Sequence, residues 1–262
     1  MTAIREAAVA GQFYPANASE LSTTIGVFFD AVEVDEGPAP KAFIVPHAGY
    51  IYSGPVAATA YVRLRPYREL FTRVILLGPC HQVAVRGLAL SGADAYRTPL
   101  GDVPLDKSAS AALDFPEVHV FDKSHQLEHS LEVHLPFLQS VLGTFSLVPV
   151  VVGNVAQEKL ADVIDALWGG PETLIVVSSD LSHYLSYDAA RTSDRATCLA
   201  IESLDPGGID HDGACGATPI GGLLIAAKRH GMRVRTLDLR NSGDTSGGRD
   251  QVVGYCAWMF LE

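Results

Sequence analysis

Imidazole side chains follow three short apolar runs of the sequence, each just beyond the last apolar residue. The runs and their histidines are 42–45 with His47, 74–77 with His81, and 174–177 with His183. Four apolar residues without polar alternation are typical of a strand that is buried on both faces. Ligands of open α/β sheets bind beyond the carboxyl ends of the strands. We therefore expect these side chains to share one site.

The chemistry that suits such a site is metal binding. Divalent first-row metals bind imidazole nitrogen, carboxylate oxygen and thiolate sulfur, and a catalytic site leaves at least one position open. His47 and His81 offer two nitrogens, and Cys215 offers a sulfur from the glycine- and alanine-rich turn 211–219. Each of these residues alone is more often a hydrogen-bonded loop histidine or an inert thiol. Their combination favours one shared metal ion.

Asp180 and His183 follow the third apolar run with two residues between them. A helical turn would place them side by side. His183 suits proton transfer because an unperturbed imidazole has a pKa of ~6.5, and Asp180 could orient it or bind the metal. The alternative for Asp180 is a simple helix N-cap, a position that aspartate favours.

A second charged cluster lies on a predicted amphipathic helix, 127–142, whose leucine stripe begins at Leu127. Pro136 should kink or divide this helix. The cluster consists of Glu128, His129, Glu132 and His134. The leucine stripe takes the core side, so only two of these residues can face a cleft. We expect His129, alone or with Glu128, to support the metal ligands or donate a proton; a solvated helix face is the alternative.

The alternation of apolar runs with amphipathic segments predicts an α/β fold, with a mixed central sheet and helices on both faces. The expected helices are 19–31 with Ser19 as N-cap, 53–63, 107–113, 127–142, 157–167, 187–204 and 220–230. Further strands are expected at 88–90, 117–121, 147–152, 234–239 and 252–260. Residues 96–102 are turn-forming and long enough to lie over a cleft. No linker or change of composition divides the chain, so we expect one domain over residues 1–262.

Charge and composition exclude several classes of protein. The formal net charge is −11, and no basic run of five or more residues occurs, which argues against nucleic-acid binding. The apolar stretches are far shorter than the ~20 residues of a membrane helix. The N-terminal residues contain Arg5 and Glu6 and no apolar core, so we expect no signal peptide and a cytoplasmic protein.

The remaining motifs add little chemistry. The four cysteines, at positions 80, 198, 215 and 256, are scattered, and in a cytosolic chain they should be reduced thiols. The glycine-rich loop 241–250 matches no phosphate-binding motif and suits a backbone that passes close to a substrate. A serine hydrolase is improbable because the sequence has no GxSxG elbow.

Seven motifs together resemble the Memo family, whose bacterial and archaeal members are also called AmmeMemoRadiSam system protein B. They are PHAGY at 46–50, GPCH at 78–81, YRTPLGD at 96–102, EHSLEVHLPF at 128–137, SSDLSH at 178–183, CGATPIG at 215–221, and SGDTSG with VVGY near the C-terminus. They occur in the order of the family and span nearly the whole chain.

The resemblance implies a fold similar to that of class III extradiol dioxygenases, which bind Fe(II) through two histidines and a carboxylate. By this resemblance His47 and His81 occupy the histidine positions, and Cys215 replaces the carboxylate. His183 matches the catalytic histidine, while Asp180 and His129 line the same pocket. A thiolate softens the site toward copper or zinc and is open to oxidation, which argues against aromatic ring cleavage.

The leading hypothesis is therefore an iron- or copper-dependent oxidoreductase in which His183 transfers a proton. A second hypothesis is a scaffold that binds a peptide or small molecule in a dioxygenase-like cleft without catalysis, as some Memo proteins have been regarded. A zinc hydrolase is a third. All three place a small molecule or peptide in the cleft and involve neither nucleic acid nor membrane.

Overall fold

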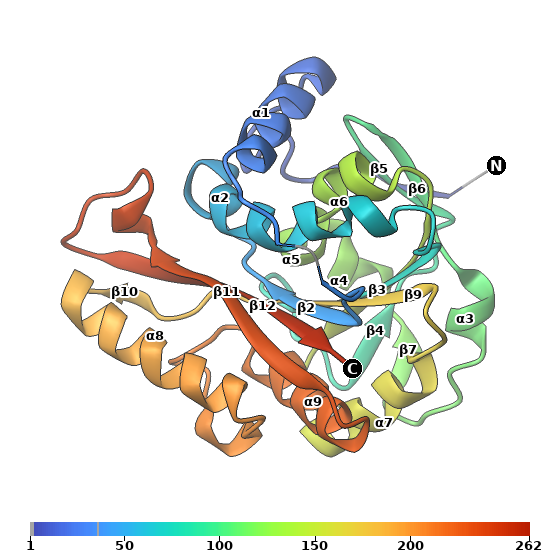
Figure 1. The fold of residues 1–262 in the computed structure, drawn as a ribbon. Coiled ribbons are helices and arrows are strands. Elements are labelled where there is room, and N and C mark those ends of the chain that lie inside the picture. The colour runs from blue at the N-terminus through green and yellow to red at the C-terminus, as the bar shows by residue number, and fades with distance from the viewer. Residues whose placement is uncertain (1–2, 36) are drawn as a thin grey trace.

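The computed structural model describes residues 3–35 and 37–262, and a mixed nine-stranded sheet runs through that part of the chain (Figure 1). Its order is β10-β12-β2-β9-β3-β8-β4-β7, and β11 pairs with β12. The strands are β2 (Ala42–Val45), β3 (Arg73–Pro79), β4 (Leu88–Leu90), β7 (Val118–Val120), β8 (Ser146–Val152), β9 (Thr173–Ser178), β10 (His183–Leu185), β11 (Arg233–Asn241) and β12 (Val252–Leu261). The predicted mixed α/β sheet is confirmed.

Four neighbouring strands, β2, β9, β3 and β8, run parallel at the centre of the sheet. Strands β12 and β4 flank them in the antiparallel sense. The residues of β2 and β9 are buried along their whole length, as the unbroken apolar runs predicted. Because parallel strands end at the same edge, the segments after β2, β3 and β9 emerge close together.

Helices cover both faces of the sheet and bury two separate apolar cores (Figure 1). One core packs below α1 (Ala18–Asp30), α2 (Tyr50–Tyr61) and α6 (Leu135–Leu142), and the other packs against α7 (Gln157–Leu167), α8 (Tyr187–Glu202) and α9 (Ala217–Arg229). Successive residues of β2 alternate between the cores: Phe43 faces the first and Ile44 the second. The expected two-sided helical cover is confirmed.

Short elements complete the description. They are the helices α3 (Lys107–Ala111), α4 (Asp122–Gln126) and α5 (His129–Glu132), and the 3-10 turns η1 (Val62–Tyr67), η2 (Pro206–Gly208) and η3 (Ser242–Asp244). A smaller sheet joins β1 (Ile4–Arg5), β5 (Ala95–Thr98) and β6 (Gly101–Pro104). Residues 96–102, which we expected to be turn-forming, contain a turn at Pro99 and Leu100, and the residues on either side of it pair as strands β5 and β6 of a hairpin.

Two local predictions about helix ends need correction or refinement. Helix α1 is capped by Asn17 rather than Ser19, since the Asn17 side chain accepts hydrogen bonds from the backbone N–H groups of Ser19 and Glu20. The expected helix 127–142 is divided into α5 and α6, and Pro136 lies in the first turn of α6, where a proline is tolerated.

Within the charged cluster Glu128, Glu132 and His134 are buried and His129 is half-buried, so the solvated-face alternative is wrong. Glu132 is inaccessible to solvent and accepts hydrogen bonds from the backbone N–H groups of Ala8, at 2.8 Å, and Val9, at 3.0 Å. It also forms an ion pair with Arg5 and accepts the Tyr14 hydroxyl. The Glu132 carboxylate therefore fastens the N-terminal segment to α5, next to the candidate site. In contrast, Leu127 of the expected core stripe is 61% exposed.

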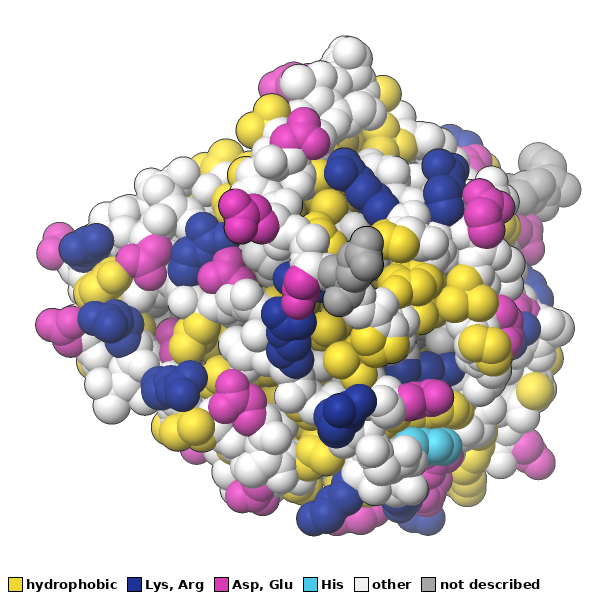
Figure 2. Space-filling view, viewed as in Figure 1, with side chains coloured by type: hydrophobic (Ala, Val, Ile, Leu, Met, Phe, Trp, Pro, Cys, Tyr) yellow, Lys and Arg dark blue, Asp and Glu magenta, His cyan; other side chains and the backbone are white. Residues whose placement is uncertain are grey.

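On the face seen in Figure 2, acidic and basic side chains are interspersed, with apolar side chains between them. This mixed pattern agrees with a chain of 30 acidic and 19 basic residues that lacks basic runs. Among the described residues, no helix is both long and apolar enough to cross a membrane.

We predict that Glu132→Ala destabilises the protein by ~3–5 kcal/mol, because it leaves the Arg5 guanidinium buried without its partner. Urea unfolding followed by circular dichroism measures the change. Glu69→Ala is the matched control, since the Glu69 side chain is 92% exposed and should contribute under ~0.5 kcal/mol. Equal effects of the two substitutions would contradict the anchoring role of Glu132.

Candidate metal centre

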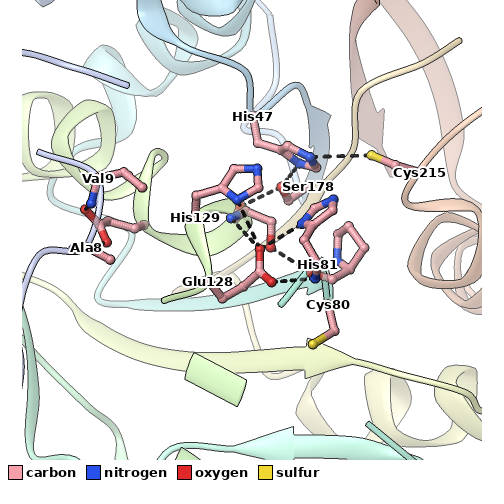
Figure 3. A network of polar contacts seen from close by, with 12 residues as sticks. Ala8, Val9, His47, Cys80, His81, Glu128, His129, Ser178 and Cys215 are labelled. Atoms are coloured by element: carbon pink, nitrogen blue, oxygen red, sulfur yellow. Dashed lines mark hydrogen bonds and ion pairs between the residues drawn. The ribbon is translucent and has the colours of Figure 1, made fainter. Parts of the chain in front are cut away.

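Three imidazoles meet at the carboxyl edge of the parallel strands (Figure 3). His47 follows β2, His81 follows β3, and His129 begins α5. Among the described residues, these three form a group in which one potential ligand atom from each lies within 4.8 Å of the others. Their ring centroids are 4.6 to 5.4 Å apart. The structure therefore contains a histidine cluster compatible with metal binding.

Hydrogen bonds fix which nitrogen of His47 is free. The Ser178 hydroxyl donates its proton to the Ser130 carbonyl at 2.6 Å, so its oxygen can only accept from Nδ1–H of His47, 2.6 Å away. Burial lowers the pKa of His47 well below its usual value, which keeps the ring neutral. The Nε2 atom then carries a lone pair, and it points toward Cys215 (Figure 3).

Glu128 orients the His81 imidazole in the way that Ser178 orients His47, by binding its Nδ1 atom. Its Oε1 lies 2.8 Å from His81 Nδ1, and its Oε2 accepts the His81 backbone N–H at 2.6 Å. Burial acts to raise the pKa of Glu128, but the hydrogen bonds from His81 and Ser130 outweigh it and hold the pKa at about 2. A carboxylate behind the imidazole is the usual support of a metal-binding histidine. His129 shares this carboxylate, with its Nδ1 3.5 Å from Oε1.

Cys215 lies beside this cluster and contacts His47. Its Sγ is 3.4 Å from His47 Nε2 and accepts the Asp180 backbone N–H at 3.3 Å. Burial, together with the Asp180 charge, raises the pKa of the Cys215 thiol to about 12, so without a cation the group is protonated. A nitrogen and a sulfur bound to one tetrahedral ion lie about 3.6 Å apart, from typical bond lengths. The spacing of the His47–Cys215 pair is close to this value, but among the described residues Cys215 is not part of the group of potential ligand atoms within 4.8 Å of one another, which consists of His47, His81 and His129.

Asp180 lies in the short segment between β9 and β10, and His183 is the first residue of β10. The Asp180 carboxylate accepts the His47 backbone N–H at 2.7 Å and so holds the loop that carries this ring. Burial raises the pKa of Asp180 to about 7, against the opposing effect of that hydrogen bond. The N-cap alternative for Asp180 is wrong, since β10 rather than a helix follows it. His183 begins β10 opposite Val253, and burial lowers its pKa.

Sequence reasoning assigned no role to the two serines that orient His47. Ser178 is the first polar residue after a buried apolar run, and that position is the signal that could have identified it. Ser130 acts through its backbone carbonyl, which no pattern of side chains reveals. The sequence suggests Glu128 only as a companion of His129, whereas its carboxylate accepts hydrogen bonds from His81 and from the Ser130 backbone N–H.

Two further histidines belong to the core rather than to the site. His125 donates from Nε2 to the Ala89 carbonyl at 3.0 Å and accepts the Tyr96 hydroxyl at Nδ1. His134 contacts the Tyr61 hydroxyl through Nδ1. Burial lowers the pKa of His125 to about 4 and that of His134 to about 3, so both are neutral groups of the interior.

The His125 imidazole should make stability depend on pH. Its folded-state pKa of about 4 lies below the unfolded value of ~6.5, so its contribution is complete above pH 6.5 and is lost as pH falls toward 4. The shift corresponds to a loss of ~3 kcal/mol. We predict that His125→Asn is less stable than wild type at pH 7 and that this difference narrows by pH 4.5 in urea unfolding. His119→Asn, at an exposed position, is the control; a pH-independent difference at His125 would refute the assignment.

Comparison with known proteins agrees with the motifs. The model of the family described as Memo-like protein matches residues 5–259. The chain belongs to the Memo family. It is 36% identical to a MEMO1 family protein of Aquifex aeolicus over 98% of this chain and 99% of the relative. It is also 37% identical to a MEMO1 family protein of Methanopyrus kandleri, over 98% of each chain, and 35% identical to one of Methanosarcina barkeri, over 97% and 98%.

Proposed function

We propose that this Memo family protein is a non-haem iron- or copper-dependent oxidoreductase, with His47, His81 and Cys215 as metal ligands. The observation that supports it most directly is the pairing of the free Nε2 of His47 with the Cys215 sulfur at 3.4 Å. Both imidazoles of the set are held at Nδ1 by buried oxygen atoms, which leaves each Nε2 free to coordinate.

Two residues are candidates for the third ligand. His129 lies within the histidine cluster, and Cys215 lies beside it. We favour Cys215 because its sulfur accepts a backbone N–H, a contact that stabilises a thiolate. The His129 ring is already in contact with two other rings: it stacks on His81, with centroids 4.6 Å apart, and packs at a tilt against Phe13, at 4.7 Å. We therefore assign His129 to the support of the site.

When bound, iron or copper would supply Lewis acidity and electron transfer, to which soft sulfur and imidazole ligands are suited. The chain's own residues then have separate tasks. His183, with a lowered pKa, is neutral near pH 7 and can accept a proton from a substrate. Asp180 holds the loop of His47, and Glu128 holds His81. The proposed similarity to class III extradiol dioxygenases agrees with this division of roles.

A metal titration distinguishes the two ligand sets. We predict that the protein, loaded anaerobically with Fe(II) or Cu(I), binds about one ion per chain, as a single three-ligand site should. Cys215→Ser should weaken binding by at least about a hundredfold, whereas His129→Gln should weaken it by about tenfold or less, as expected for a supporting residue. Competition with a chelator measures both affinities. The reverse ranking would make His129 the third ligand.

A second experiment separates catalysis from simple ligand binding. We predict that His183→Ala retains the metal and loses turnover, because it removes the proton acceptor but no ligand. Metal content and oxygen consumption with reduced organic substrates are the two measurements. If metal-stripped wild-type protein binds a peptide undiminished, and the loaded protein consumes no oxygen with any substrate, the protein is a binding scaffold instead.

A further inference from the structure

A pocket of about 550 Å³ opens directly beside the candidate metal centre, and both His81 and Cys215 line it. Its volume lies within the range of small-molecule sites. Most of its wall is aliphatic, with side chains that include Val83, Ala84 and Val152. A molecule in this pocket would therefore contact two of the proposed ligands at one end and apolar surface along its body.

The aliphatic wall is built as a fixed surface. The segment that carries Val83 and Ala84 continues to Val85, whose carbonyl accepts the Asn154 backbone N–H at 2.9 Å. The Gly153 backbone N–H donates a further hydrogen bond to the Gly87 carbonyl, also at 2.9 Å. A Cβ atom on Gly153 would lie 2.2 Å from the Val85 carbonyl oxygen, so the two backbones are in close contact. The pocket is preformed on this side.

The charge of the lining is the informative feature. Among the described residues that line the pocket there is no lysine, arginine, aspartate or glutamate. The carboxylates of Glu128 and Asp180 lie behind the histidines, and the whole chain carries a net charge of −11. A phosphate or carboxylate placed along the aliphatic wall, away from the proposed metal ligands, would lose part of its hydration and find no cationic lysine or arginine side chain there, which is costly.

The lining also contains polar side chains that can form hydrogen bonds. The side chains of Thr218 and His211 line the pocket together, with His211 Nε2 3.4 Å from Thr218 Oγ1. Asn154 adds an amide to the same lining. A few polar groups on a mostly apolar surface orient a ligand through its hydroxyl or carbonyl groups.

We propose that the substrate of this metal centre is a compact, uncharged organic molecule with an apolar body and one or two hydroxyl or carbonyl groups. This inference rests on the proposed function, because it assumes that chemistry occurs at His81 and Cys215. It places phosphorylated and carboxylate-rich peptides outside the substrate class.

Three probes of matched size test the inference: benzyl alcohol, 4-(hydroxymethyl)benzoate and 4-(hydroxymethyl)benzylamine. They share a hydroxymethyl group and differ in the charge at the opposite end. With the Cu(I)-loaded protein under anaerobic conditions, we predict that benzyl alcohol binds at least about tenfold more tightly than either charged probe, since each charge would lie on apolar surface without a charged side chain of the lining to pair with. Methyl NMR shifts of Val83, Val85 and Val152 measure affinity and locate the probe.

Ala84→Arg supplies the missing cation at an exposed position of the lining. It should strengthen binding of the benzoate probe by at least about tenfold, by analogy with other charge-assisted pairs. Ala196→Arg, at an exposed position of α8, is the matched control and should leave all three affinities unchanged.

Copper loading is measured before the probes are added, so a failure of the proposed metal centre can be distinguished from a failure of the proposed substrate class. Loss of stoichiometric Cu(I) binding would contradict the metal centre itself. A loaded protein that binds the benzoate probe as tightly as benzyl alcohol, or that shows no shift of the pocket methyls with any probe, would overturn the neutral substrate class.

Discussion

The parallel pairing of β2, β9 and β3 is the constraint on which the rest of the site depends. In this register Val45 lies opposite Ser178, so the loop after β2 and the end of β9 emerge side by side. Ser178 is thereby brought against the imidazole of His47, and Asp180 against its backbone. A shift of one residue would turn each of these side chains to the other face of the sheet. The core that fixes the register therefore also fixes the chemistry.

Buried polar groups hold the side chains of the site in fixed orientations. Ser178 and Glu128 each hold an imidazole at Nδ1, and Glu132 holds the N-terminal segment against the same short helix, α5. Such groups are costly to bury unless they are fully paired, and here each oxygen has a specific donor. This arrangement orients the free nitrogens before any ion binds, which lowers the reorganisation that binding requires.

Several features of the fold followed directly from sequence pattern. Unbroken apolar runs identified the central strands, and apolar periodicity identified helices such as α7. Local chemistry was less decisive where two residues could serve the same role. Asn17 caps α1 although Ser19 also suits an N-cap, because the helix begins at Ala18 and Ser19 already lies in its first turn. Residues 96–102 have turn-forming composition, and they form a hairpin whose first strand, β5, also pairs with the distant strand β1 through Ala95 and Tyr96.

The sequence by itself determined the family, the strands that precede His47 and His81, and the residue types available for coordination. These features depend on short stretches of chain, where composition and spacing carry the information. Only the tertiary structure decided that His129 joins the histidine cluster, that Glu128 supports His81 and that Glu132 faces the N-terminal segment. Those outcomes depend on contacts between residues far apart in the sequence. Which side chains of a helix become buried is decided by the segments that pack against it.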